Sequence, residues 1–271
     1  MKKNRKIISI RNFIIVVTIV FSVVSCKEII EIDLNTLNPE IVIEGDIKLD
    51  SVAVVRLSYT SDYFGNNGAD YIVKSTVVLI DDLGNIDTLS YVGDGYYKGE
   101  NIKGELNRSY TLSFTEGDKI FMATSILNSP AIIENVSYFE SDFVKPGTEE
   151  TVYAFNLKLE DSGKESYYLI KIWINNVLEN DGYMLVNCSD NSNVGFTDFS
   201  YLGVELHEGD SVVLNVYSID EPVFTFYNQL NDQLVKSMGG STPYNPQSNF
   251  GPAVLGCFSA CSCVSYSGVV E

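Results

Sequence analysis

The residues best suited to chemistry are cysteines, three of which lie close to the C-terminus. Cys257, Cys261 and Cys263 have the same parity, so an uninterrupted strand would place all three thiols on one face. Such a set could offer soft thiolate ligands to Cu(I) or Zn(II). The competing interpretation is that these residues and Cys188 form disulfides, which an oxidising compartment favours.

The spacing of the thiols restricts which disulfides can form. In a straight strand Cys257 and Cys261 would be about 13 Å apart, whereas bridged Cα atoms lie within about 7 Å. A bond between them would need a bulge, and Cys261–Cys263 would be strained because neighbouring side chains on one face are parallel. We favour disulfides over a metal and expect at least one, which either includes Cys188 or joins two of the C-terminal cysteines.

Other candidate catalytic groups are sparse. His207, which precedes a turn at Gly209-Asp210, is the only histidine and is expected to be exposed. A multi-histidine zinc site is therefore excluded, and a Ser-His-Asp triad would depend entirely on His207. Asp81 and Asp82 could hold Ca²⁺, but turns favour these residues in any case. No nucleophile-elbow, zincin, phosphate-loop or dinucleotide motif is present, so we expect no enzymatic activity and no cofactor.

The fifth cysteine, Cys26, has a different context. Residues 1–25 begin with five Lys and Arg residues and continue as an uncharged apolar run from Phe13 to Ser25, the pattern of a signal peptide. The run is shorter than the ~20 residues that span a bilayer. Val23-Val24-Ser25-Cys26 resembles the bacterial lipobox, in which the thiol is acylated and the chain is cut before the cysteine. Several acyl chains make a firm membrane anchor, because each buried methylene contributes about 0.8 kcal/mol.

The residues after Cys26 indicate where the anchored protein resides. Cys26-Lys27-Glu28 resembles the surface-export signal of Bacteroidota lipoproteins, and no aspartate follows the cysteine to retain the protein in the inner membrane. We expect a protein that is attached to the outer membrane by its N-terminal lipid and faces the cell surface.

The composition limits the partners of the mature chain. Removal of residues 1–25 leaves 271 − 25 = 246 residues, with 18 − 5 = 13 basic and 36 acidic side chains, a formal charge of 13 − 36 = −23. This charge opposes binding to nucleic-acid phosphates. A hydrophobic content of 45% argues for a packed core rather than a disordered chain.

The elements that must position these residues are mostly strands. Short β-branched runs, separated by turn-forming residues, predict an all-β fold. Residues 26–39 are expected to form a lipidated tether, and residues 40–128 an Ig/transthyretin-like β-sandwich. The order of turn and tyrosine motifs in residues 40–128 also looks like the transthyretin-like carboxypeptidase-regulatory module.

A second domain is expected after a domain boundary at Asn128-Ser129-Pro130. Residues 129–271 predict a β-sandwich-like domain that ends with a pair of strands in residues 253–269. One helix is predicted near residues 222–237, because Asp220 is a good cap and the following apolar residues have helical spacing.

Several of these segments resemble one family. The segment Ile41–Ile47, the Gly95-Tyr96 turn, Tyr110-Thr111-Leu112 and the closing segment Ser248–Ala260 are similar to the Bacteroidota lipoproteins called domain-of-unknown-function family 4249. Cys257 stands where an aromatic residue is usual. The resemblance implies a lipoprotein of the outer membrane, encoded beside a TonB-dependent receptor, and it carries no catalytic residue over to this chain.

Two functional hypotheses follow from the sequence. The first is an outer-membrane lipoprotein without catalytic activity that serves as an accessory or ligand-capturing partner of a TonB-dependent receptor. The alternative is a stand-alone surface adhesion or envelope-structural lipoprotein.

Overall fold

The strands of the first half follow the alternation of apolar residues in the sequence. The computed structural model of the chain describes residues 39–61, 70–141, 151–160, 165–179, 183–188, 196–236 and 244–271. In β2 (Val52–Tyr59) the alternate residues Ala53, Val55 and Leu57 are fully buried. The other strands of this half are β1 (Ile41–Lys48), β3 (Val77–Asp81), β4 (Ile86–Thr88), β5 (Ser90–Gly93), β6 (Tyr96–Lys103), β7 (Arg108–Glu116) and β8 (Lys119–Leu127).

The described residues of the second half form further strands and the helix α2. The helix α2 spans Glu221–Lys236, close to the predicted residues 222–237. The strands are β9 (Ile133–Glu140), β10 (Tyr153–Glu160), β11 (Ser166–Ile174), β12 (Val177–Leu178), β13 (Met184–Cys188), β14 (Phe196–Leu206), β15 (Ser211–Ile219) and β16 (Val254–Val269). The predicted all-β class is confirmed.

Three sheets form two sandwiches that share one layer. A nine-stranded sheet has the order β12-β11-β15-β16-β1-β2-β6-β5, with β13 paired to β11. The four-stranded sheet β4-β3-β7-β8 packs on the β1 end of this sheet around the core that contains Ile43, Leu57 and Phe114. The three-stranded sheet β14-β10-β9 packs on its β15 end around the core that contains Phe155, Leu157 and Leu214.

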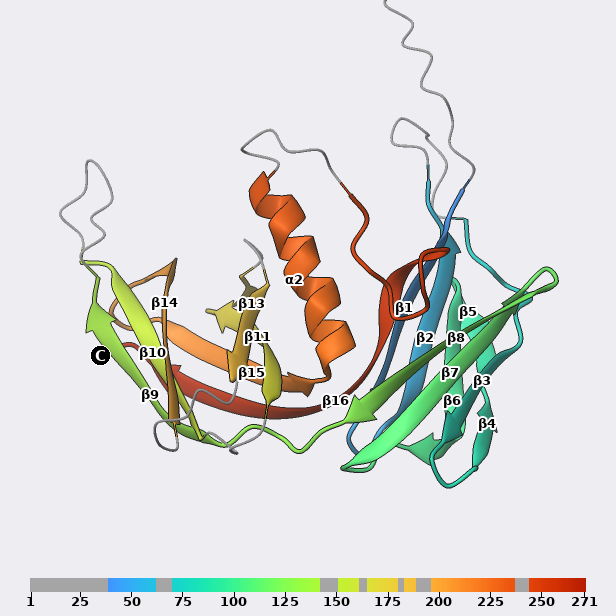
Figure 1. Ribbon diagram of the computed structural model, residues 1–271. Coiled ribbons are helices and arrows are strands. Elements are labelled where there is room, and N and C mark those ends of the chain that lie inside the picture. Colours follow the sequence, from blue (N-terminus) through green and yellow to red (C-terminus); the bar gives the residue numbers. More distant parts are fainter. Residues whose placement is uncertain are drawn as a thin grey trace, which may run out of the picture. The chain divides into compact units, whose positions relative to one another are not determined.

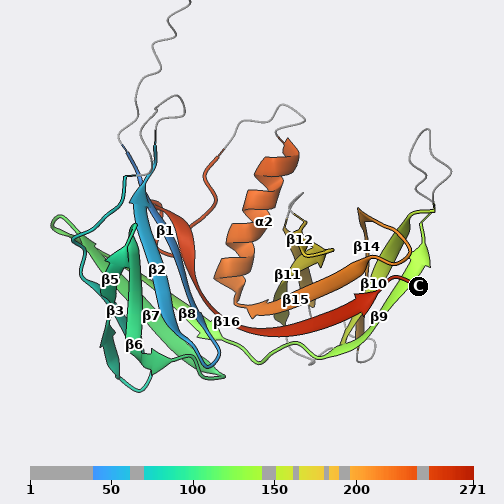
Figure 2. The same ribbon diagram turned by 180° about the vertical axis from the view of Figure 1, so that it is seen from behind.

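The helix covers the opposite face of the shared sheet. On β15, Val212, Leu214 and Val216 contribute to the second sandwich core, whereas Ile219, on the other face, packs with Val223 of α2. Asp220 caps the N-terminus of the helix, because its Oδ1 accepts a hydrogen bond from Val223 N at 3.3 Å. Figures 1 and 2 show α2 standing on the face of the sheet that the two smaller sheets leave open.

Strand β16 differs most from the sequence prediction. Residues 253–269 were expected to form two strands, but Val254–Val269 is a single strand of 16 residues. Its first half pairs in parallel with β1, and its second half pairs antiparallel with β15 (Figure 1). The predicted boundary at residue 128 assigns all of β16 to the second domain, whereas Val254, Phe258 and Ala260 lie in the first core. Residues Pro39–Glu271 form one compact unit.

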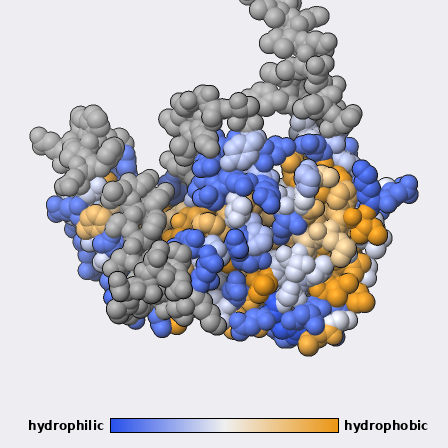
Figure 3. Space-filling view, viewed as in Figure 1, coloured by the Kyte–Doolittle hydropathy of each residue, from blue (hydrophilic) through white to orange (hydrophobic). Residues whose placement is uncertain are grey.

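One face of the first sandwich carries exposed apolar side chains. Ile120, Met122 and Ile126 lie at alternate positions on β8 and are 69%, 57% and 47% exposed. Figure 3 shows apolar residues gathered on the side of the molecule where the four-stranded sheet lies. No helix within the described residues is long and apolar enough to cross a membrane.

Candidate functional site: a groove beside helix α2

A groove of about 570 Å³ lies between α2 and the open face of the nine-stranded sheet. Strands β1, β2, β16, β15 and β11 contribute its floor, and α2 and the segment Asn245-Pro246 contribute its sides. Small-molecule sites have volumes of about 300–1,000 Å³. The groove is therefore large enough for a small ligand.

The alternation of side chains in β1 explains why charged residues line the groove. Ile43 and Ile47 point into the first sandwich core, so the residues of the opposite parity point the other way. Glu44, Asp46 and Lys48 consequently face the groove. In β16 the same rule directs Cys257, Ser259 and Cys261 into it.

One end of the groove is basic. The Nζ of Lys171, on β11, lies 5.6 Å from the centre of the Tyr217 ring, a cation–π contact. Lys48 Nζ is 3.4 Å from Asp46 Oδ2, and both side chains of this pair are almost half exposed. Partial burial works to lower the pKa of Lys48, but the neighbouring Asp46 carboxylate holds it above its ordinary value. Lys48 is therefore a stable cation at neutral pH.

The other end of the groove holds an arginine that is fixed by contacts with the protein itself. Arg56 lies 5.1 Å from the ring centres of both Tyr71 and Tyr96. Its guanidinium donates to Tyr71 Oη at 2.9 Å, to Glu44 Oε2 at 3.4 Å and to the Asp94 carbonyl at 3.4 Å. These contacts fix Arg56 as part of the wall.

The apolar side of the groove comes from α2 and the strands beneath it. Phe226, Tyr227 and Leu230 project from the helix over the buried residues Leu169 and Ile219. The Tyr227 ring lies 4.9 Å from that of Tyr183. Asn231 of α2 accepts a hydrogen bond from Tyr183 N at 2.7 Å and donates one to the Tyr183 carbonyl, which holds the helix against the segment before β13.

The cysteines are arranged differently from the prediction. Cys257, Cys261 and Cys263 are free thiols. Strands β11 and β15 lie between β16 and the strand that carries Cys188, a separation of about 14 Å at ~4.8 Å per strand. Cys188 is therefore too far from β16 to form a disulfide with it. The other three cysteines follow one another along the same strand with parallel side chains, and none of them is bonded to another.

The three C-terminal thiols share one strand face but differ in environment. Burial, with a smaller effect of Asp220, raises the pKa of Cys257 to about 12, and burial raises that of Cys261 to about 12. Both thiols are thus protonated and act as apolar lining, while Cys263 is exposed. Within the described residues, no three His, Cys, Asp or Glu side chains are placed to hold a metal ion.

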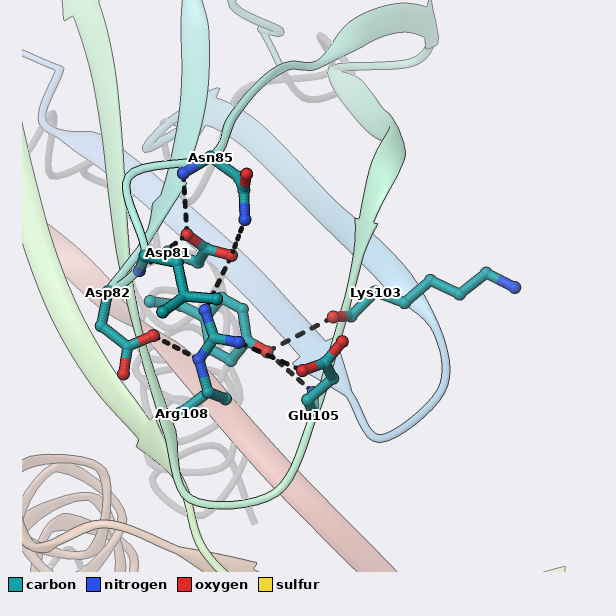
Figure 4. Close-up of polar contacts among 8 residues, drawn as sticks. Asp81, Asp82, Asn85, Lys103, Glu105 and Arg108 are labelled. Atoms are coloured by element: carbon teal, nitrogen blue, oxygen red, sulfur yellow. Dashed lines mark hydrogen bonds and ion pairs between the residues drawn. The ribbon is translucent and has the colours of Figure 1, made fainter.

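The adjacent acids Asp81 and Asp82 have a structural role in the β3–β4 turn. Asp81 Oδ1 accepts hydrogen bonds from the backbone nitrogens of Leu83 and Asn85, at 3.0 and 2.9 Å. Arg108 Nη2 lies 2.9 Å from Asp81 Oδ2, and its other nitrogens pair with Asp82 and Glu105 (Figure 4). The guanidinium of Arg108 occupies the position where a metal cation would bind. The role of Asp81 and Asp82 is therefore to stabilise the turn.

The sequence prediction missed Asp87, which joins the two layers of the first sandwich. It lies on β4, is only 1% exposed, and accepts hydrogen bonds from three backbone N–H groups of β6. The sign available in the sequence was that Asp87 has the same parity as the buried residue Leu89, which places both on the core face.

Two predicted residues lie away from the groove. His207 is 45% exposed at the turn after β14, where its Nδ1 is 3.7 Å from Asp210 Oδ2, and it is not one of the groove residues. The predicted signal peptide of residues 1–25, Cys26 and the rest of the tether up to residue 38 lie outside the described residues.

The fold and the groove define a class of protein: a double β-sandwich with a ligand-sized groove on the face of the shared sheet. The chain belongs to the family described as a domain of unknown function, DUF4249, whose model matches residues 27–267. The family predicted from the sequence is thereby confirmed. A comparison with curated proteins gave no significant match.

Proposed function

We propose that this protein is a non-catalytic, lipid-anchored component of the outer membrane that captures a ligand and presents it to a TonB-dependent receptor. The groove beside α2 carries the proposal, because its volume and its mixture of apolar and charged lining suit a small molecule. The lipobox-like sequence at Cys26 supports the anchor. The pairing with a receptor is what the resemblance to the family implies.

The chemistry of the groove favours binding over catalysis. Among the described residues that line it, Glu44 is paired with Arg56 and Asp46 with Lys48. The two buried thiols have pKa values of about 12 and remain protonated at neutral pH. A nucleophile or general base needs a pKa near the working pH, or a partner that activates it.

Affinity purification of the native lipoprotein from outer membranes tests this function. We expect a TonB-dependent barrel to co-purify and to be identified by mass spectrometry. The matched control is Cys26→Ala in the same strain, which should lose labelling by a clickable fatty acid and most of the co-purifying barrel. A wild-type preparation without any barrel would refute the receptor role and favour the stand-alone adhesion or envelope protein. Fatty-acid labelling of the Cys26→Ala variant would refute the anchor.

A further inference from the structure

We propose that the groove beside α2 binds a small amphipathic anion, with a carboxylate or phosphate at Lys171 and Lys48 and an apolar body against α2. This inference rests on the proposed function and specifies the class of ligand. It follows from how the charges of the groove are paired and where the apolar surface begins.

The pairing of charges leaves one cation over. The groove holds three cations, Lys48, Arg56 and Lys171, and two carboxylates. Glu44 lies 3.4 Å from Arg56, and Asp46 lies 3.4 Å from Lys48. No carboxylate among the described residues forms an ion pair with Lys171, whose contact is the face of Tyr217. Lys171 is therefore the unmatched charge of the groove.

The groove has one more cation than it has carboxylates, although the protein as a whole is acidic. Three of the 13 basic residues that follow Cys26 line the groove, but only two of the 36 acidic residues do. Because the mature chain is strongly acidic overall, this local excess of cations favours an anion in the groove, and a partly buried cation attracts its ligand more strongly than an exposed one.

Tyr217 adds a hydrogen-bond donor between the two lysines. It lies on β15, between β11, which carries Lys171, and β16, which pairs with β1. Burial, with a smaller effect of Cys263, raises the pKa of Tyr217 above its ordinary value, although Lys48 acts against this. Its hydroxyl therefore keeps its proton at neutral pH and can donate to an anionic oxygen.

The apolar part of the ligand has a defined place. Leu169 is the β-sheet neighbour of Tyr217, and Ile219 follows on the same face of β15. Phe226, Tyr227 and Leu230 of α2 face these residues across the groove. An anion held at Lys171 would therefore extend its apolar body along α2.

A matched pair of probes tests the charge requirement. The chain has one tryptophan, Trp173, two residues from Lys171 on the same face of β11, so its fluorescence reports binding at the basic end. We would titrate the full acylated lipoprotein, held in nanodiscs of neutral lipid, with 4-phenylbutyrate, 4-phenylbutyramide and butyrate. We expect phenylbutyrate to bind about fivefold more tightly than the amide and than butyrate, with the preference for charge weakening at high salt.

Two variants test whether Lys171 is responsible for the preference for the anion. Lys171→Gln should reduce the preference for the anion to about twofold or less, while Lys119→Gln, the same charge change at the exposed first residue of β8, should leave it unchanged. Circular dichroism checks that both variants fold. Equal binding of phenylbutyrate and its amide would overturn the anion assignment while leaving ligand capture intact. Failure of every probe to bind would overturn both, whereas co-purification of a barrel addresses only the receptor.

Discussion

At the scale of single residues, buried carboxylates are used as structural acceptors. Asp87 Oδ2 accepts hydrogen bonds from the backbone nitrogens of Glu100, Asn101 and Ile102, at 2.9, 2.8 and 3.1 Å. Its Oδ1 accepts from Asn101 Nδ2 at 3.0 Å. Burial acts to raise the pKa of Asp87, but the backbone donors lower it below the ordinary value of 3.8. Asp87 is thus an ionised link between β4 and β6.

Substitution of Asp87 should destabilise the fold according to how many donors lose their acceptor. Asp87→Ala leaves three backbone N–H groups and the Asn101 amide without this acceptor, and should lower the free energy of unfolding by about 3 kcal/mol or more. Asp87→Asn keeps one acceptor oxygen, so its loss should be smaller. The control Asp118→Asn, at an exposed turn, should have no effect. Urea unfolding followed by circular dichroism measures all three, and equal stability of the Ala variant and the wild type would contradict the role of Asp87.

The same experiment gives a pH dependence with a defined sign. Because the folded-state pKa of Asp87 is lowered, its contribution is complete above pH 3.8 and is lost as the pH falls through the folded-state value. The difference in stability between the wild type and Asp87→Asn should therefore shrink under acid.

At the scale of elements, the junction between β1 and β16 depends on one glycine. Gly256 is paired with Ile43 and has a φ of +90°. A Cβ at this position would lie 1.9 Å from the backbone oxygen of Ile43. The two strands approach too closely for any side chain, so the sequence must have glycine here.

Gly256→Ala should destabilise the protein by more than the backbone conformation alone requires. Gly251 is the matched control, because it has a φ of +89° with no atom within 4 Å of a Cβ. Gly251→Ala should cost about 1–2 kcal/mol for the left-handed conformation, and Gly256→Ala clearly more, because β16 must also move away from β1. Thermal unfolding midpoints compare the two, and equal shifts would show that the close approach is wrong.

At the scale of the whole molecule, β16 makes the two sandwiches parts of one cooperative structure. Its residues 254–261 pair with β1, and residues 262–269 pair with β15. Phe258 is fully buried in the first core, while Val264 packs against the second. A substitution that destabilises one core should therefore also destabilise the other, because β16 belongs to both.

Phe258→Ala tests this coupling. The cavity should cost about 3–5 kcal/mol, and the loss should appear in the fluorescence of Trp173, which lies in the other half on β11. We expect the unfolding midpoint measured by Trp173 to fall together with that measured by circular dichroism. Exposed Ile120→Ala is the control and should leave both unchanged. A Trp173 transition that does not move would show two independent domains divided near residue 128.

The sequence by itself determined the local features of this protein. The alternation in segments such as Val52–Tyr59 and the cap and apolar spacing after Asp220 specify strands and helix, because these patterns reflect which face of an element is buried. The sequence also identified the family, and parity placed Cys257, Cys261 and Cys263 on one face of a strand.

The tertiary structure decided what depends on contacts between distant segments. The separation of Cys188 from the C-terminal cysteines could not be predicted, because local spacing does not reveal that β11 and β15 lie between β13 and β16. The shared strand was missed because a run of 16 strand residues contains no sign of which partner each half will choose. The groove was missed for the same reason: Lys48, Lys171 and Tyr227 are ordinary in their own elements, and only the packing of α2 on the nine-stranded sheet brings them to one site.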